Sequence, residues 1–172
     1  MDTLFGNILS WKYIEWIRKN LKKMFAVIAS MRGFSQLSNF WFIESEECIF
    51  IIELLKSSYG NYYYLELKIF IQGVFGKKYT ISKELGKTWR DVHIRLLPEY
   101  DIFLDLDTQL SYDDRKQGIE SAFNNFVMPF SKKALFLSGI CLLWNENQIL
   151  MSDALRNQVE KLIEAKKSQQ PE

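Results

Sequence analysis

The chain has almost no net charge and very few of the residues that build metal sites. Its 22 Lys and Arg nearly balance 21 Asp and Glu over 172 residues, which excludes a basic field over the whole molecule. We therefore expect no nucleic-acid partner. His93 is the only histidine, and the chain has only two cysteines, so the sequence offers no zinc site. We expect neither a metal ion nor another cofactor.

Cysteine is scarce, and long apolar runs are missing. Cys48 and Cys141 each lie in a short apolar stretch, which is typical of buried free thiols in a reducing compartment rather than of a disulfide framework. The longest nearly uncharged stretch, residues 134–144, falls well short of the roughly 20 residues that cross a bilayer. Lys12 interrupts the N-terminal apolar residues before a signal-peptide core can form. We expect a cytoplasmic protein.

Aromatic and β-branched residues are abundant, and they gather in residues 39–72. Three runs of such residues are separated there by two short polar turns, a pattern that predicts an antiparallel sheet. We expect strands at residues 40–43, 48–55, 62–72 and 91–97. Alternation along the third strand predicts that Tyr63, Leu65, Leu67, Ile69 and Ile71 face the core, and that Tyr62, Tyr64, Glu66, Lys68 and Phe70 face outward.

The second strand lacks polar alternation. Residues 49–52 are all apolar, as expected of a central strand that is covered on both faces, and we expect a helix over it. Residues 73–86 then form a glycine-punctuated, basic connection, which we expect to be mobile. Asp105 and Asp107 stand in a later acidic run. This run lacks the glycine and the terminal glutamate of a calcium loop, so we expect a solvated loop.

Helical periodicity marks both ends of the chain. Residues 4–31 carry an apolar stripe with a basic opposite side, and Gly33 ends that helix. Ser111 begins another helix, in which Pro129 predicts an end or a kink. Further helices are expected at residues 132–143 and 153–166.

These elements predict one α+β domain over residues 1–172. Its parts are an amphipathic helical segment at residues 1–32, a sheet at 34–97 and C-terminal helices at 111–167. The sheet is expected to be an antiparallel meander of about four or more strands, with the helices packed mainly on one face.

The loop of residues 56–61 is the leading candidate site. Lys56 offers a cation, Tyr59 offers an amphipathic ring, and hydrogen-bonding groups come from Ser57, Ser58 and Asn61. This combination suits the recognition of a peptide or a polar ligand. The alternative is a simple hairpin loop, in which serine, glycine and asparagine serve turn geometry alone.

A second candidate lies on the fourth strand, where alternation predicts Asp91, His93 and Arg95 on one face. A proton-transfer role for His93 requires a nucleophile that the fold brings close. The alternative is a strand histidine that is hydrogen-bonded to its neighbours. With Trp41 and Tyr59, His93 and Arg95 would line a cleft between the sheet and the 56–61 loop.

Several short motifs follow one another in a recognisable order. They are Arg32-Gly33-Phe34, Asn39-Phe40-Trp41, the run from Leu55 to Tyr63, His93-Ile94-Arg95, and the run from Leu104 to Asp107 before Asp114-Arg115. Over about residues 21–130 this order resembles the bacterial family known as domain of unknown function 4304. That family usually has glutamine where Leu55 stands and asparagine at or near Glu66, so this chain departs at both positions. The resemblance implies the fold and supplies no catalytic residues.

Three functions fit these observations. The first is a small cytoplasmic bacterial protein that binds another protein through the sheet and residues 56–61, as an immunity protein binds its toxin, because no catalytic set is visible. The second is a small-ligand protein or an enzyme that uses the cleft. The third is a membrane-surface protein that binds through residues 4–25, which include Trp11 and Trp16. For that segment we expect core packing rather than membrane binding.

Overall fold

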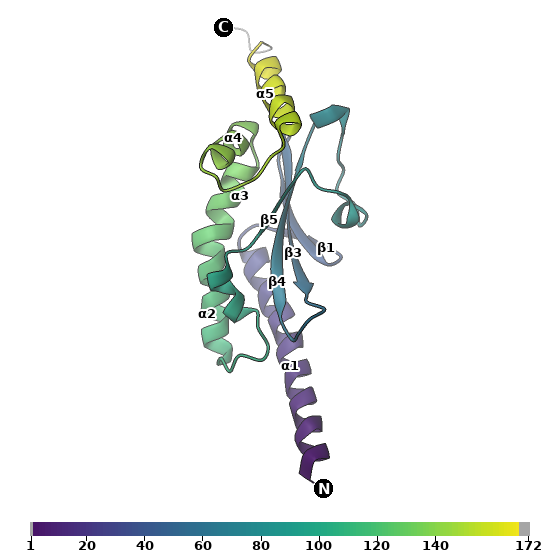
Figure 1. Ribbon diagram of the computed structural model, residues 1–172, viewed down its shortest axis with the longest axis vertical. Coiled ribbons are helices and arrows are strands. Elements are labelled where there is room, and N and C mark those ends of the chain that lie inside the picture. The colour runs from purple at the N-terminus through teal and green to yellow at the C-terminus, as the bar shows by residue number, and fades with distance from the viewer. Residues whose placement is uncertain (1, 169–172) are drawn as a thin grey trace.

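The computed structural model describes residues 2–168, with side chains from residue 14 onward. The described residues form one antiparallel sheet whose five strands follow in chain order, with the helices gathered on one side (Figure 1). The strands are β1 Ser35–Leu37, β2 Phe40–Glu44, β3 Cys48–Lys56, β4 Tyr63–Ile71 and β5 Val92–Arg95. The predicted α+β class, with an antiparallel meander, is confirmed.

The helices occupy the two ends of the described chain. They are α1 Asp2–Met31, α2 Tyr112–Ala122, α3 Met128–Ala134, α4 Leu137–Asn145 and α5 Asp153–Lys167. Short 3-10 helices, η1 Val74–Gly76, η2 Leu85–Lys87 and η3 Pro98–Phe103, lie in the connections before and after β5, and a π-helical turn, η4 Phe123–Val127, joins α2 to α3. The four predicted strands correspond to β2 through β5. The three-residue strand β1 was not predicted, because so short a segment carries too little alternation to be recognised.

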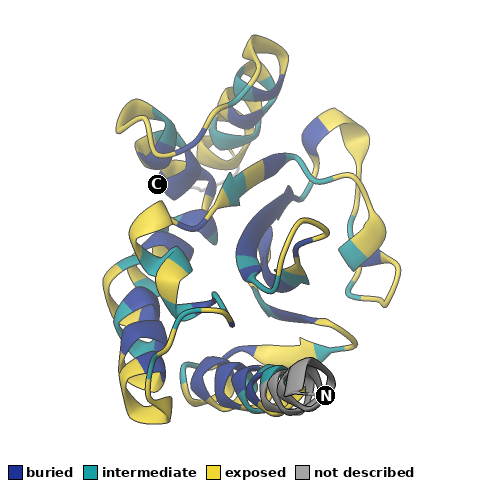
Figure 2. Cartoon of the chain, turned by 60° about the horizontal axis from the view of Figure 1, so that its bottom comes forward, coloured by how far each residue is buried: buried dark blue, intermediate teal, exposed yellow. Residues whose placement is uncertain are grey.

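The first face of the sheet, on the helix side, holds the larger core. The five residues of β4 that were predicted to face inward are all buried there. On α1, Leu21, Phe25 and Ile28 are buried against them, and the Phe25 ring centroid lies 4.8 Å from that of Trp41 in an edge-on contact. Figure 2 shows the buried residues of the helices on the sides that face the sheet. The expected core packing of α1 is therefore confirmed where side chains are described.

Part of the proposed membrane-binding segment lies outside the described side chains. The side chains of residues 4–13, including Trp11, belong to that part. Trp16 is 57% exposed, whereas the neighbouring Ile17 is buried. Within the described residues, no helix combines the length and the apolarity that spanning a membrane requires.

The second face of the sheet, away from the helices, is covered over half its length by a loop. Residues 77–88, called the covering segment below, place Leu85 on a smaller core that contains Phe40, Ile51 and Phe70. The prediction that the alternate residues of β4 face solvent is wrong in this half, because Lys68 and Phe70 are buried under that segment. The central strand β3 is covered on both faces as expected, by helices on the first face and by the covering segment on the second. The connection predicted to be mobile packs on the sheet.

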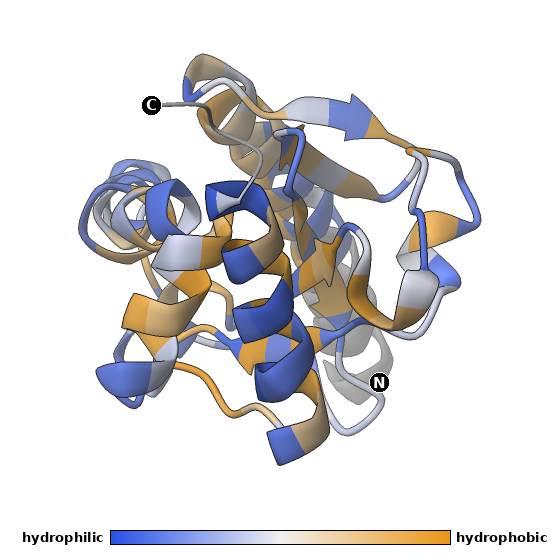
Figure 3. Cartoon of the chain, turned by 90° about the horizontal axis from the view of Figure 1, so that it is seen from above, coloured by the Kyte–Doolittle hydropathy of each residue, from blue (hydrophilic) through white to orange (hydrophobic). Residues whose placement is uncertain are grey.

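The helices after the sheet start as the sequence indicates but divide differently. The Ser111 hydroxyl accepts a hydrogen bond from the N–H of Asp114 at 3.0 Å, as expected of a helix cap. At the π turn, the Met128 N–H donates to the carbonyl of Phe123 five residues earlier, and α3 begins there with Pro129 in its first turn. Pro129 therefore marks a junction between helical segments, as predicted. Figure 3 shows hydrophilic residues on much of the outer surface of α5.

The prediction of one helix at residues 132–143 is wrong, because this stretch belongs to two helices, α3 and α4, which are separated at Leu135 and Phe136. The turn between β2 and β3 binds both sides of this break. The Ser45 hydroxyl donates to the Leu135 carbonyl at 2.5 Å, and the Glu47 carboxylate accepts from the Leu137 N–H at 2.6 Å. Contacts from a distant turn thus satisfy backbone groups that a continuous helix would have paired internally.

Candidate functional site

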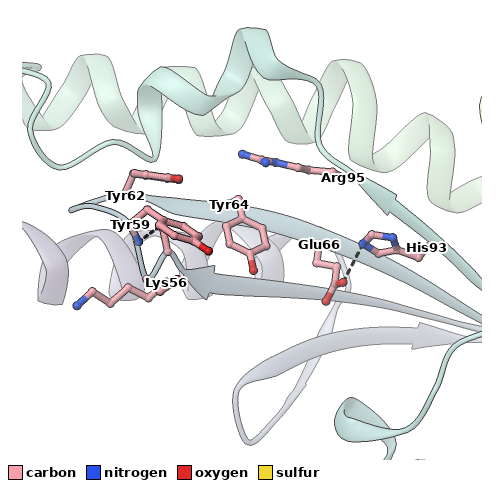
Figure 4. Close-up of a pocket in the computed structure, with 9 residues that line it drawn as sticks. Lys56, Tyr59, Tyr62, Tyr64, Glu66, His93 and Arg95 are labelled. Carbon is pink, nitrogen blue, oxygen red and sulfur yellow. Dashed lines mark hydrogen bonds and ion pairs between the residues drawn. The ribbon is translucent and has the colours of Figure 1, made fainter.

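The uncovered half of the second face contains a pocket of about 530 Å³. It lies over β4 and β5 and beside the loop that joins β3 to β4 (Figure 4). Its lining residues are Lys56, Ser57, Ser58, Tyr59, Tyr62, Tyr64, Glu66, His93 and Arg95. This set combines aromatic rings, hydroxyl groups and cations.

Strand pairing explains why the sheet residues meet on this face. Glu66 pairs with Arg95, and Lys68 pairs with His93, in the antiparallel register of β4 and β5. Paired residues point to the same side, and residues two apart along a strand do so as well. Tyr64, Glu66, His93 and Arg95 therefore share the second face, and the covering segment ends before it reaches Tyr64.

Two residues hold the shape of the 56–61 loop. The Ser57 N–H donates to the Tyr62 carbonyl at 2.9 Å, and the Ser57 hydroxyl accepts from the Tyr59 N–H at 3.0 Å. The Asn61 amide donates to the Asp107 carboxylate at 3.1 Å. Tyr59 is 94% exposed at the rim of the pocket. The loop thus presents an exposed tyrosine on a backbone that is already ordered.

A row of buried charges forms the floor between the pocket and the covering segment. The Lys68 ammonium lies 2.6 Å from Glu53 and 3.1 Å from Glu66, and it donates to the Gly86 carbonyl at 2.9 Å. The side-chain amide of Asn39 donates to the other oxygen of Glu53. Each buried carboxylate therefore has a cation beside it, as burial of charge requires.

Glu66 also reaches His93 and Arg90. Its second carboxylate oxygen lies 2.8 Å from His93 Nε2 and 3.1 Å from the Arg90 guanidinium. Burial and the Arg90 charge lower the pKa of His93 below 6.5, against a smaller opposing effect from the Glu66 carboxylate. The imidazole is therefore neutral at pH 7, and its Nε2–H donates to Glu66.

Arg95 is held over the wall of the pocket. Its guanidinium lies 5.0 Å from the centroid of the Tyr64 ring and 3.1 Å from the Asp101 carboxylate. Tyr62, two residues before Tyr64, forms an isolated β-bridge with Asp105. A cation over an aromatic ring and a second cation at Lys56 give the pocket groups that hold an anionic or polar ligand.

The structure brings six of the eight predicted site residues together. Lys56, Ser57, Ser58, Tyr59, His93 and Arg95 all line the pocket. Asn61 is bonded to Asp107 instead. Trp41 pairs with Ile52 and is buried in the core on the first face, so the expected cleft does not include it.

The pocket contains three residues that were not predicted to belong to the site, and it lacks Asp91. Tyr62, Tyr64 and Glu66 were not among the predicted site residues, although alternation had put them on the outward side of β4. Asp91 lies one residue before β5 and does not line the pocket. Its carboxylate accepts from the Ile71 N–H at 2.8 Å and from the Tyr79 hydroxyl at 3.0 Å.

The acidic run after η3 is organised by its own hydrogen bonds. The Asp105 carboxylate accepts from the Asp107 N–H at 2.9 Å and from the Thr108 hydroxyl at 2.8 Å. In the part of the chain that the structure describes, no group of three or more His, Cys, Asp or Glu is arranged to hold a metal ion.

Comparison with known proteins gives a family and no described activity. The profile of a family described as a domain of unknown function, DUF4304, matches residues 25–133, which is more than half of the chain. The matched segment contains the whole sheet and the pocket. No curated protein and no solved structure matched the chain. Because the match covers more than half of the chain, including the sheet and the pocket, the chain belongs to the DUF4304 family.

Proposed function

We propose that the protein is a non-enzymatic protein-interaction module and that the pocket over β4 and β5 is its binding site. The observation that carries this proposal is the exposure of Tyr59, 94% of which is open to solvent beside Lys56. Tyrosine and arginine are the residue types, with tryptophan, in which protein-binding energy is concentrated. The pocket holds three tyrosines and Arg95.

Preorganisation of the site supports the same function. Ser57 and Asn61 hold the loop through hydrogen bonds, and Arg95 is held by Asp101 over Tyr64. Ordering of side chains and loops is a main cost of association, so a site that is ordered in advance binds more tightly. The aromatic rings would cover apolar parts of a partner, and the cations at the rim would meet its carboxylates.

The setting of this function is a reducing compartment. Cys48 and Cys141 are both free thiols. Burial raises the pKa of the Cys48 thiol to about 12, so it is unreactive at neutral pH. We propose a cytoplasmic bacterial protein whose partner is another protein, with a toxin neutralised by an immunity-like complex as one form of that partnership.

The experiment is selection of binders followed by truncation of the site. A random peptide library is selected on the immobilised full chain, and the dissociation constants of the enriched peptides are measured by calorimetry. Tyr59→Ala and Arg95→Ala should each weaken binding at least about tenfold. Tyr112→Ala is the matched control, because Tyr112 is a half-exposed tyrosine on α2, away from the pocket. The proposal is overturned if no peptide is enriched, or if both pocket variants bind like the control.

A small ligand is the second candidate occupant. The volume of about 530 Å³ lies within the usual range of small-molecule sites, and the Glu66–His93 contact places a neutral imidazole at the floor. Such a ligand would carry a carboxylate or phosphate for Lys56 and Arg95. A thermal-shift screen of small organic acids and nucleotides tests it. A stabilising compound whose effect survives both Lys56→Ala and Arg95→Ala would not be bound in this way.

A further inference from the structure

β5 is an edge strand whose outer side carries free backbone groups. It is the last strand in the sheet order and pairs with β4 alone. The Leu96 N–H donates to the Leu65 carbonyl at 3.0 Å. Backbone groups of successive residues in an antiparallel strand point to alternate sides, so Ile94 also points to β4, and His93 and Arg95 point outward. Within the described residues, no backbone hydrogen bond outside the sheet involves His93 or Arg95.

Hollows lie on both sides of this edge. On the second face the pocket is lined by the side chains of His93 and Arg95. On the first face a hollow of about 410 Å³ opens beside Ile94, between β5 and the helices. Its lining is mainly apolar and includes Ile94, Leu97, Phe126, Pro129 and Phe130. Phe126 and Phe130 are stacked with ring centroids 5.7 Å apart.

We propose that the partner adds an extended segment to β5 as a further strand, with acidic side chains entering the pocket and apolar side chains entering the hollow beside Ile94. This inference rests on the proposed protein-binding function and specifies the partner. Side chains of an added strand alternate between the two faces of the sheet, as those of β5 do. The two N–H donors and two carbonyl acceptors of His93 and Arg95 would pair with its backbone.

Charge decides which face takes the acidic side chains. The cations around the pocket are Lys56, Arg90 and Arg95. Arg90 is paired with Glu66 and Arg95 with Asp101, whereas none of the salt bridges among the described residues involves Lys56, so the pocket keeps an excess of positive charge. On the other face, Lys133 lies 2.5 Å from Glu146, and the other polar residues that line the hollow beside Ile94 are uncharged: Asn125, Asn147 and Gln148. A strand with acidic residues on one side and apolar residues on the other matches both surfaces.

The experiment compares two peptides of equal composition. One is an acetylated octapeptide of alternating Glu and Val, and the other has its four Glu before its four Val. NMR titration of the full chain should give a dissociation constant at least about tenfold lower for the alternating peptide. Amide exchange should slow at His93 and Arg95 when that peptide binds, because only an added strand pairs their N–H groups.

A proline variant isolates the outward N–H group. Arg95→Pro removes both the side chain and the N–H, whereas Arg95→Ala removes the side chain alone, and proline is tolerated in an edge strand where the N–H points outward. The alternating peptide should bind Arg95→Pro at least about tenfold more weakly than Arg95→Ala.

Equal binding of the two peptides, or unchanged exchange at His93 and Arg95 in the complex, would overturn the added strand. Both results leave the proposed pocket function standing if peptides from the random library still depend on Tyr59. Protection of His93 and Arg95 without peptide, together with a dimer in sedimentation, would overturn the proposal in another way, since a second copy would then occupy the edge. The exchange measurement uses the unaltered chain, so it decides the matter even where Arg95→Pro fails to fold.

Discussion

The ammonium nitrogen of Lys68 lies 2.6 Å from a carboxylate oxygen of Glu53, and both side chains are less than a tenth exposed. The same nitrogen lies 3.1 Å from Glu66 and bonds the Gly86 carbonyl. One buried cation therefore bridges two buried carboxylates, of which Glu66 is also paired with Arg90, and ties the covering segment to the sheet. Three acceptors surround an ammonium group with three protons, so its hydrogen bonds are satisfied.

Replacement of Lys68 by methionine should destabilise the fold strongly. Lys68→Met leaves Glu53 and Glu66 buried without that cation, and breaking a buried ion pair by removing one partner costs about 3–5 kcal/mol. Urea unfolding measures the loss. Lys87→Met is the control, because the pair of Lys87 with Glu84 is largely exposed and its loss should leave stability nearly unchanged. A similar loss for the two variants would contradict this account of the floor.

Two glycines in the helices should differ in their tolerance of alanine. A Cβ at Gly139 would lie 2.1 Å from the backbone carbonyl oxygen of Lys133, whereas one at Gly118 would meet the half-buried ring of Phe103 at 2.2 Å. A ring can turn aside and a helix backbone cannot, so Gly139→Ala should cost about 3 kcal/mol and Gly118→Ala about 1 kcal/mol. Thermal unfolding of both variants checks the order, and the reverse order would refute it.

The stability contributed by Glu47 should vanish in acid. Burial raises the pKa of this carboxyl, but the hydrogen bonds from Lys166 and the Leu137 N–H outweigh it, and the folded pKa lies below 4.5. The unfolded chain therefore takes up the proton at a higher pH than the folded chain. The stabilisation is complete above the unfolded pKa and is lost as the pH falls through the folded pKa.

Glu47→Gln measures this contribution. At about pH 7 the variant should be less stable by about 1 kcal/mol, a modest figure because Lys166 is half exposed. As the pH falls through the folded pKa, which lies below 4.5, the difference from the unaltered chain should shrink toward zero. Glu46→Gln, at the exposed neighbouring position, should lack this dependence. A difference that persists unchanged at about pH 3 would show that the charge of Glu47 is not its cause.

The single histidine allows its own charge state to be read directly. Proton NMR should give a pKa of His93 below 6.5, because burial and the Arg90 cation disfavour the charged ring. Arg90→Gln removes one of these causes and should raise that pKa. Arg32→Gln is the control, because Arg32 bonds Asn124 and is not among the charges that act on His93. A pKa that Arg90→Gln leaves unchanged would remove Arg90 from the account.

Strand alternation predicted the outward face of β4 at the site, but it could not predict the face on which Trp41 lies. The polar residues of β4 alternate with apolar ones, which placed Tyr64 and Glu66 on one face. Trp41 stands between Phe40 and Phe42, so no polar neighbour indicates which way its side chain points. Its face is set by pairing with Ile52, and that register depends on the turn between β2 and β3.

Two further features depend on contacts between distant segments. The covering segment has a glycine and several lysines, which are typical of a mobile loop, and contacts with the sheet hold it there, among them the burial of Leu85 and the hydrogen bond from Lys68 to the Gly86 carbonyl. The stretch from Lys132 to Leu143 contains one glycine and no proline, so local signals favour one helix. At the break, the Leu135 carbonyl accepts a hydrogen bond from Ser45, 90 residues away in the sequence, which no local signal reveals.

The π turn at Phe123–Val127 also constrains the length of the chain. It accommodates one residue more than an α-helical turn, and one residue corresponds to a rotation of about 100° about the helix axis. The π turn winds less per residue and so absorbs that rotation: deleting a single residue there would restore a regular α-helix and leave Phe130 of α3 facing the core. A deletion within α2 or α3 would instead rotate all later residues by about 100°, so relatives with the same packing should differ in length by one residue at this turn and not in the helices beside it.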